Sequence, residues 1–142
     1  MRHHHTNDLT ELIAQGEHQQ QDFKYRIHDA VKLARSVSAF ANTDGGRLLI
    51  GVRDDGHVAG VRSDEDIFMM EKAATQCCRP AADISFDTIA HEGHTVVVAT
   101  VSAATAKPVC AIDESGRKTA YVRVDDEYIM ASPIHLEMWK QD

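Results

Sequence analysis

The segment that decides the fold runs Ser38-Ala39-Phe40-Ala41-Asn42-Thr43-Asp44-Gly45-Gly46-Arg47-Leu48-Leu49-Ile50-Gly51-Val52-Arg53-Asp54-Asp55-Gly56. Apolar residues recur at helical spacing from Ala30 to Ala41, which predicts an amphipathic helix. The polar residues that follow disfavour helix, and the glycine pair ends it. The apolar run from Arg47 to Arg53 predicts a buried strand, and Asp55-Gly56 predicts a tight turn that forms a hairpin with residues 57–61.

Working outward, the chain predicts short helices and hairpins on both sides of this segment. We expect a short helix around Leu9, a strand within 19–26, a helix ended by Pro80 and a last helix after Ser132-Pro133. Two further hairpins are expected, 84–90 with 95–101 and 109–112 with 119–124. This order predicts an α+β domain, with mostly antiparallel hairpins and the helices packed on one side.

The length of 142 residues suits one domain, which we place at residues 9–142. Residues 1–8, which include Met-Arg-His-His-His, are expected to be disordered or tag-like. No apolar run approaches the roughly 20 residues that span a bilayer, and no signal peptide is evident. Three cysteines, an odd number, favour free thiols. We therefore expect a cytoplasmic protein that does not associate with membranes.

The glycines in the opening segment raise the question of a phosphate-binding loop. Such loops run from strand through glycines to helix, because the helix N-terminus holds the anion. The order here is reversed, which excludes a P-loop. A looser nucleotide site at Asn42, Gly45 and Gly46 stays open, although a helix C-cap is the favoured interpretation.

Acidic residues flank the same segment. Glu17 and Asp22 precede the long helix, and Asp54 ends the strand that follows it. Three converging carboxylates would repel one another unless a divalent cation lay between them. Such a cation would bind a phosphodiester oxygen and activate water, and Lys24 would contact the scissile phosphate. The competing interpretation makes Asp54 a turn residue and Glu17 a solvated one, and spacing alone favours it.

The charged residues indicate how large a nucleic-acid interface this chain could form. The formal net charge of −7 counts against non-specific coating of nucleic acid but allows a local basic face. The candidates for such a face are Lys24, Arg26, Arg47, Arg53 and, on a late strand, Arg123. A phosphate-binding surface and an ordinary solvated set of charges are equally compatible with this pattern, and Arg123 has the alternative of supporting the sheet.

Taken together, these motifs resemble the Schlafen AlbA_2 domain family. The resemblance rests on Ala-Phe-Ala-Asn-Thr-x-Gly-Gly and Ile-Gly-Val-x-Asp-Asp-Gly within the opening segment. Upstream, Glu17 followed by Asp22-Phe23-Lys24 resembles the family's Glu…Glu-Phe-Lys signature, with aspartate in place of the second glutamate. Downstream, Lys107-Pro108 and Tyr121-Val122-Arg123-Val124 resemble its late hairpin. The match covers about residues 9–139.

The resemblance implies a nucleic-acid-binding domain, because bacterial members are described as DNA-binding domains and transcriptional regulators. Vertebrate Schlafen proteins cut RNA with three metal-binding carboxylates, which by position fall on Glu17, Asp22 and Asp54. An alternative expectation is therefore a nuclease that uses Mg²⁺ or Mn²⁺. A second alternative, from an older description of the family, is ATP binding. Since the nuclease members form a cradle from two such domains, we expect a homodimer here.

Overall fold

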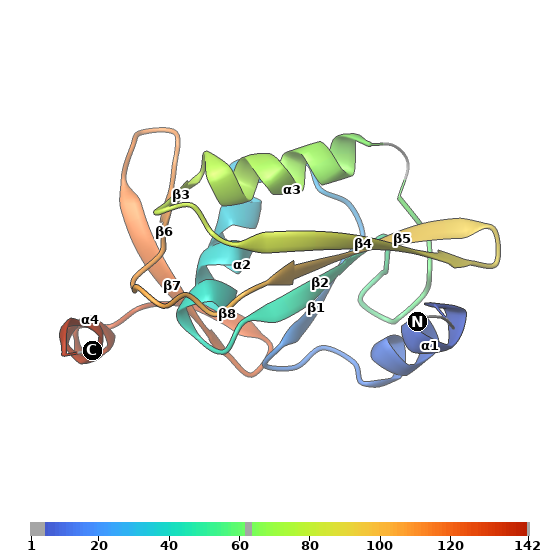
Figure 1. Ribbon diagram of the computed structural model, residues 1–142, viewed down its shortest axis with the longest axis horizontal. Helices are drawn as coiled ribbons and strands as arrows, with labels where there is room; N and C mark the ends of the chain where they lie inside the picture. Colours follow the sequence, from blue (N-terminus) through green and yellow to red (C-terminus); the bar gives the residue numbers. More distant parts are fainter. Residues whose placement is uncertain (1–4, 62–63, 142) are drawn as a thin grey trace.

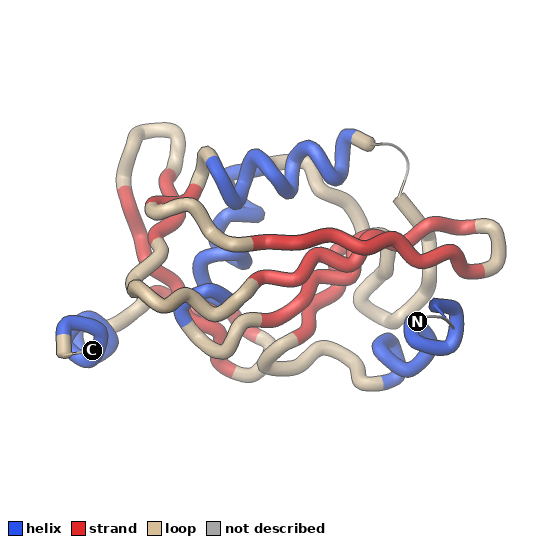
Figure 2. Tube along the Cα trace, in the orientation of Figure 1, coloured by secondary structure: helices blue, strands red, loops and turns tan. Residues whose placement is uncertain are grey.

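The computed structural model describes residues 5–61 and 64–141, and it confirms the α+β class (Figures 1 and 2). The helices are α1 (His5–Ala14), α2 (Ala30–Asn42), α3 (Glu65–Thr75) and α4 (Pro133–Lys140). The strands are β1 (Gln21–Lys24), β2 (Gly46–Ile50), β3 (Cys78–Arg79), β4 (Ile84–His91), β5 (His94–Val101), β6 (Cys110–Ile112), β7 (Lys118–Val124) and β8 (Glu127–Met130).

The strands form two four-stranded sheets, with orders β1-β2-β5-β4 and β3-β6-β7-β8. All pairings are antiparallel except that of β1 with β2, which is parallel and sets Gln21 opposite Arg47. The two hairpins expected downstream are present as β4–β5 and β6–β7. The sequence did not predict β3 or β8, and β8 becomes important at the candidate site.

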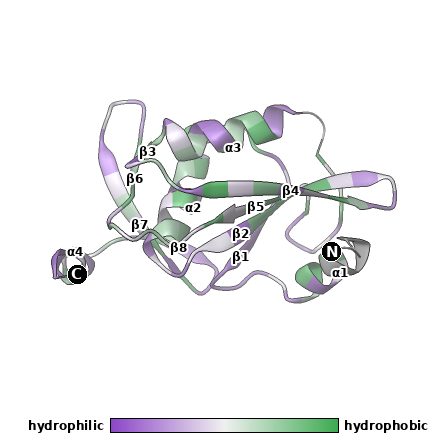
Figure 3. Cartoon of the chain, viewed as in Figure 1, coloured by the Kyte–Doolittle hydropathy of each residue, from purple (hydrophilic) through white to green (hydrophobic). Residues whose placement is uncertain are grey.

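Helix α2 packs between the two sheets and forms the centre of the larger core. Its apolar stripe, Leu33, Val37 and Phe40, is at most 5% exposed. These side chains share one cluster with residues of β2 and β5 from the first sheet and of β6 from the second. Green segments mark the hydrophobic residues on α2, α3 and β4 (Figure 3). Each fully buried side chain of this kind contributes about 1.5–3 kcal/mol relative to an exposed one.

The predicted boundaries of α2 are confirmed by its caps. Asp29 accepts a hydrogen bond from the Val31 N–H at 2.9 Å and so begins the helix. At the other end, the Gly45 N–H donates to the Phe40 carbonyl at 2.8 Å. Gly45 has a φ of +74°, and a Cβ there would lie 2.8 Å from the Val101 carbonyl oxygen. Glycine is required at this position, because a side chain would be strained and would clash.

The first sheet is covered on both faces, which corrects the expectation of helices on one side only. Leu48 and Ile50 of β2 belong to the α2 cluster, whereas Leu49 between them belongs to a second cluster with Leu9 of α1. Successive strand residues point to opposite faces, so α1 and α2 cover opposite sides. The uninterrupted apolar run of β2 is typical of a strand buried on both faces.

Three boundaries differ from the sequence prediction. The hairpin expected after Asp55-Gly56 is reduced to a single bridge between Val52 and Val58. The reason is Gly51, which has a φ of +102° and packs directly against Gly60, so β2 stops at Ile50. Helix α1 begins at His5, inside the segment 1–8 that was expected to be disordered or tag-like; residues 1–4 lie outside the described part.

No helix in the described ranges has the length and apolar character needed to span a membrane.

Candidate functional site

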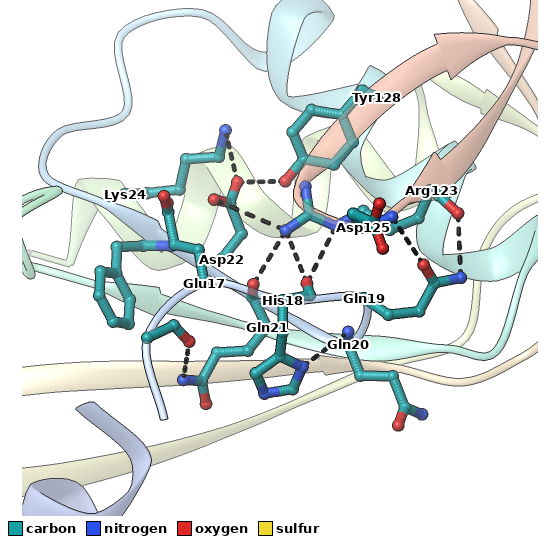
Figure 4. Close-up of polar contacts among 12 residues, drawn as sticks. Glu17, His18, Gln19, Gln20, Gln21, Asp22, Lys24, Arg123, Asp125 and Tyr128 are labelled. Atoms are coloured by element: carbon teal, nitrogen blue, oxygen red, sulfur yellow. Dashed lines mark hydrogen bonds and ion pairs between the residues drawn. The ribbon is translucent and has the colours of Figure 1, made fainter. Parts of the chain in front are cut away.

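Strand β1 carries two of the site residues predicted from the sequence, Asp22 and Lys24, to the junction of the two sheets. Alternation along the strand places Asp22 and Lys24 on one face and Phe23 on the other. Phe23 is buried in the smaller core with Leu49, which fixes the strand. Asp22 and Lys24 then face β7 and β8 of the second sheet (Figure 4).

Two glutamines anchor the start of β1 to its surroundings. Gln21 is fully buried and donates to the carbonyls of Leu12 and Gly16 at 2.6 and 2.8 Å. Gln19 bridges to the second sheet, where its amide donates to the Arg123 carbonyl at 3.0 Å and accepts from the Asp125 N–H at 2.8 Å. These bonds supply the partners that a polar strand needs when it is buried.

Asp22 is buried, at 6% exposure, and is surrounded by donors. The Tyr128 hydroxyl donates to its Oδ2, Lys24 Nζ lies 3.2 Å from the same oxygen, and Arg123 Nη2 lies 3.9 Å from Oδ1. Burial by itself would raise the pKa of Asp22. The hydrogen bonds and cations outweigh burial and hold its pKa below the usual value, so the carboxylate stays charged.

The pKa of Glu17 is shifted in the opposite direction to that of Asp22. A hydrogen bond with Asp22, followed by burial and by the charges of Asp22 and Asp54, raises the pKa of Glu17 to about 7. The Phe23 N–H donates to Glu17 Oε2 at 3.1 Å and opposes this change. The structure therefore brings Glu17 and Asp22 into contact. Asp54 is exposed and acts on Glu17 through its charge.

The fit of a metal ion to these carboxylates can be judged from the donor set. Within 5–61 and 64–141, no group of three or more His, Cys, Asp or Glu side chains is close enough to hold a metal ion. Mg²⁺, however, is commonly held by one or two carboxylates together with water and substrate phosphates. Glu17 and Asp22, which are in hydrogen-bond contact, match that smaller set, and Asp54 would add negative charge beside it.

Arg26 and Arg53 meet on one aromatic ring. Their guanidinium carbons lie 4.3 and 4.5 Å from the ring centroid of Tyr25. Each Nη2 also donates to the Tyr25 hydroxyl, at 3.1 and 3.3 Å respectively. Cation–π contacts of this kind hold guanidinium groups in place without neutralising them. Tyr25 thus joins a residue that follows β1 to a residue that follows β2.

The other two arginines predicted to bind nucleic acid have structural partners instead. Arg123 is 1% exposed and donates to the carbonyls of His18 and Gln21 at 2.9 Å, so phosphate has no access to it. Arg47 donates to Gln21 and Gln15 at 2.7 and 2.9 Å. The prediction that Arg123 contacts phosphate is therefore corrected, because its buried guanidinium supports the junction between the sheets.

The residues of the possible nucleotide site also make contacts inside the protein; they are Asn42, Gly45 and Gly46. Asn42 is 4% exposed, and its amide donates to the carbonyls of Val109 and Tyr121 while its oxygen accepts from the Val109 N–H. A Cβ at Gly46 would lie 2.4 Å from the Phe40 ring. Both polar atoms of the Asn42 side chain are occupied inside the protein. These internal contacts favour the helix C-cap interpretation over the looser nucleotide site.

Two residues of the site were missed by the sequence analysis, Tyr128 and Tyr25. Tyr128 lies on β8, which pairs with β7 after a turn at Asp125 with a φ of +56°. The signal that could have found it is the pair Asp125-Asp126 directly after an apolar strand, since acidic residues tolerate this turn conformation. Tyr25 was assigned only to a strand, and nothing in its spacing indicates contact with Arg53.

The family model described as Schlafen, AlbA_2 matches residues 17–131, which include every residue of this site. The crystal structure of the DIP2311 protein from Corynebacterium diphtheriae is similar at 27% identity and a TM-score of 0.59. The match covers 87% of this chain and 24% of that one, so this chain spans about a quarter of DIP2311.

A second similar structure is that of the N-terminal domain of a RecG-related protein from Nitrosomonas europaea, solved by solution NMR. The identity is 26% and the TM-score 0.55, and the match covers 87% of this chain and 88% of that domain. No protein of curated function matches the chain.

Proposed function

The chain belongs to the Schlafen AlbA_2 family, and from this premise we propose that it binds nucleic acid, with DNA as the first ligand to test. The observation that carries the proposal is the placement of Arg26 and Arg53 on Tyr25, close in the chain to Lys24. Guanidinium groups held in fixed positions bind phosphate oxygens with charge-assisted hydrogen bonds. The name of the RecG-related protein refers to a DNA helicase, which supports a nucleic-acid ligand for this fold.

Because the net charge is acidic, we propose that nucleic acid binds to a local basic surface. With a formal charge of −7, the protein as a whole repels a phosphate backbone, so binding relies on these few cations. Such binding weakens as salt rises, because each contacted phosphate releases counterions. We propose a small interface of this kind rather than a continuous basic groove.

The proposal is tested by fluorescence anisotropy with labelled DNA and RNA of one sequence, single-stranded and duplex, at several salt concentrations. We expect Arg53→Gln to lower the slope of log K against log salt by about 1. Arg117→Gln is the matched control, because Arg117 is also exposed but lies in the turn between β6 and β7. Equal slopes for the two variants, or no binding by wild type at low salt, would overturn the proposal.

A second candidate function, cleavage of nucleic acid, is favoured by the contact between Glu17 and Asp22. A Mg²⁺ or Mn²⁺ ion held by this pair would stabilise charge on a phosphate and lower the pKa of a bound water. Lys24 Nζ lies 3.2 Å from Asp22, which supports a contact between Lys24 and the same phosphate. Glu17, with a pKa near 7, is able to accept or donate a proton at neutral pH.

We also propose that the functional unit is a homodimer. Exposed apolar side chains gather at the end of β7, on β8 and on α4; they are Val124, Ile129, Met130, Ile134, Leu136 and Met138. Helix α4 has no buried residue within the chain, and it stands away from the sheets in Figure 1. Light scattering after gel filtration is expected to give twice the chain mass of 15.7 kDa, and a monomeric mass would contradict the proposal.

A further inference from the structure

A pocket of about 520 Å³ lies beside the acidic pair, at the start of α2. It is lined by Lys24, Arg26, Ile27, His28, Asp29, Lys32 and Leu33. Its volume is within the range of pockets that hold one small ligand. Lys24 is shared between this pocket and the candidate site, since it also contacts Asp22. A ligand in the pocket would therefore lie next to the carboxylates.

The charges in the pocket favour an anion. Three cationic side chains line it, against one carboxylate, Asp29, which is already bonded to the Val31 N–H at 2.9 Å. Lys32 is exposed and has no hydrogen-bond or ion-pair partner among the residues described. Arg26 Nη1 is buried and, within the described ranges, lacks a hydrogen-bond partner. A buried donor without a partner is costly, and an anion would satisfy it.

We propose that this pocket binds the terminal phosphate of a nucleic-acid strand, an inference that rests on the proposed function. A terminal phosphomonoester carries a charge of about −1.5 to −2 at pH 7, compared with about −1 for a phosphate within the chain. Three cations around one small volume discriminate in favour of the more highly charged group. Arg26 lines the pocket and also stacks on Tyr25, so a strand that leaves the pocket next meets Arg53.

The experiment compares one short, internally labelled single strand with a 5′-phosphate, a 3′-phosphate or hydroxyl groups at both ends. We expect one phosphorylated form to bind about tenfold more tightly than the hydroxyl form. Lys32→Ala is expected to remove this advantage and to leave binding of the hydroxyl form unchanged. The matched control is Lys72→Ala, which removes a second exposed helical lysine, on α3, and is expected to keep the advantage.

Each result has a distinct meaning. Equal binding of the three strands would overturn the inference and leave the proposed function intact. Absence of binding for all three would overturn the proposed function as well. Unlabelled nucleoside monophosphate and inorganic phosphate are added as competitors. If free nucleotide bound as tightly as the phosphorylated strand, recognition of a strand end would be overturned in favour of a free-nucleotide site.

Discussion

Tyr128 on β8 donates a hydrogen bond to Asp22 on β1, across 106 positions of the sequence. This contact joins the second sheet to the strand that carries the candidate site. Asp22 is buried, so its charge persists only because donors surround it. The acidic pair is therefore a product of the tertiary fold, and neither β1 nor β8 specifies it alone.

The first prediction concerns this hydrogen bond. Tyr128→Phe removes one donor from a buried carboxylate and keeps the ring that packs edge-on against Phe40. We expect the free energy of unfolding to fall by about 1–3 kcal/mol, measured by urea denaturation. Tyr121→Phe is the control, because no hydrogen bond of the Tyr121 hydroxyl is found in the described structure. Equal stability of the two variants would show that the Tyr128–Asp22 bond does not support the fold.

The second prediction concerns the buried guanidinium of Arg123. It bonds two carbonyls of the segment before and within β1 and lies over the rings of Phe40 and Tyr128, 5.1 and 4.6 Å from their centroids. Arg123→Lys keeps the charge but loses the planar fork, so we expect a loss of about 2–4 kcal/mol in urea denaturation. Arg117→Lys, at an exposed position, is expected to change stability by less than about 0.5 kcal/mol. A similar effect of both changes would contradict the structural role of Arg123.

The third prediction concerns pH. The pKa of Glu17 rises from its ordinary value of 4.5 to about 7 on folding, so the folded state binds this proton more tightly. Its contribution to stability is fully present below pH about 4.5 and is lost as pH rises toward 7. In Glu17→Gln this loss should disappear.

The measurement is the free energy of unfolding of wild type and Glu17→Gln across that pH range. The difference between the two proteins isolates Glu17 from all the groups that the two proteins share. Wild type is expected to lose stability relative to the variant as pH rises. Parallel curves would mean that folding does not raise the pKa of Glu17.

Local sequence predicted the centre of the fold well and its long-range pairings poorly. The spacing of Leu33, Val37 and Phe40, and the glycines after them, contain the information for α2 and its end. The parallel pairing of β1 with β2 depends on two segments separated by a helix, so no local pattern encodes it. Strand β8 is short, its residues are mostly exposed, and apolar and polar residues do not clearly alternate along it. For this reason the sequence did not predict the strand or the role of Tyr128.

In the candidate site, too, some residues were predictable from local motifs and others depend on long-range contacts. Glu17, Asp22 and Lys24 were proposed from motifs, and the structure gathers them at one junction. The expected surface role of Arg123 could not be tested from sequence, because β7 is buried on both faces near its end and adjacent Val122 and Arg123 are both inside. Burial of a charged residue depends on partners, here carbonyls from far along the chain.

The fourth prediction rests on the second candidate function. Asp54→Asn removes a charge beside Glu17 and is expected to lower Mn²⁺-dependent cleavage of labelled RNA or DNA by about 10- to 100-fold. Asp55→Asn is the matched control in the same turn, since asparagine keeps the oxygen that accepts from the His57 N–H. Both residues are exposed, so neither variant should unfold. Equal cleavage by both variants would exclude Asp54 from the site.

The most direct test of the central claim is an NMR titration of the ¹⁵N-labelled protein, whose mass of 15.7 kDa suits the method, with a short single strand of DNA. We expect the largest shift changes at the amides of Lys24, Arg26 and Arg53, with little change at Asn42 and Gly45. Changes centred on the Asn42–Gly46 segment, or no changes at low salt, would contradict it.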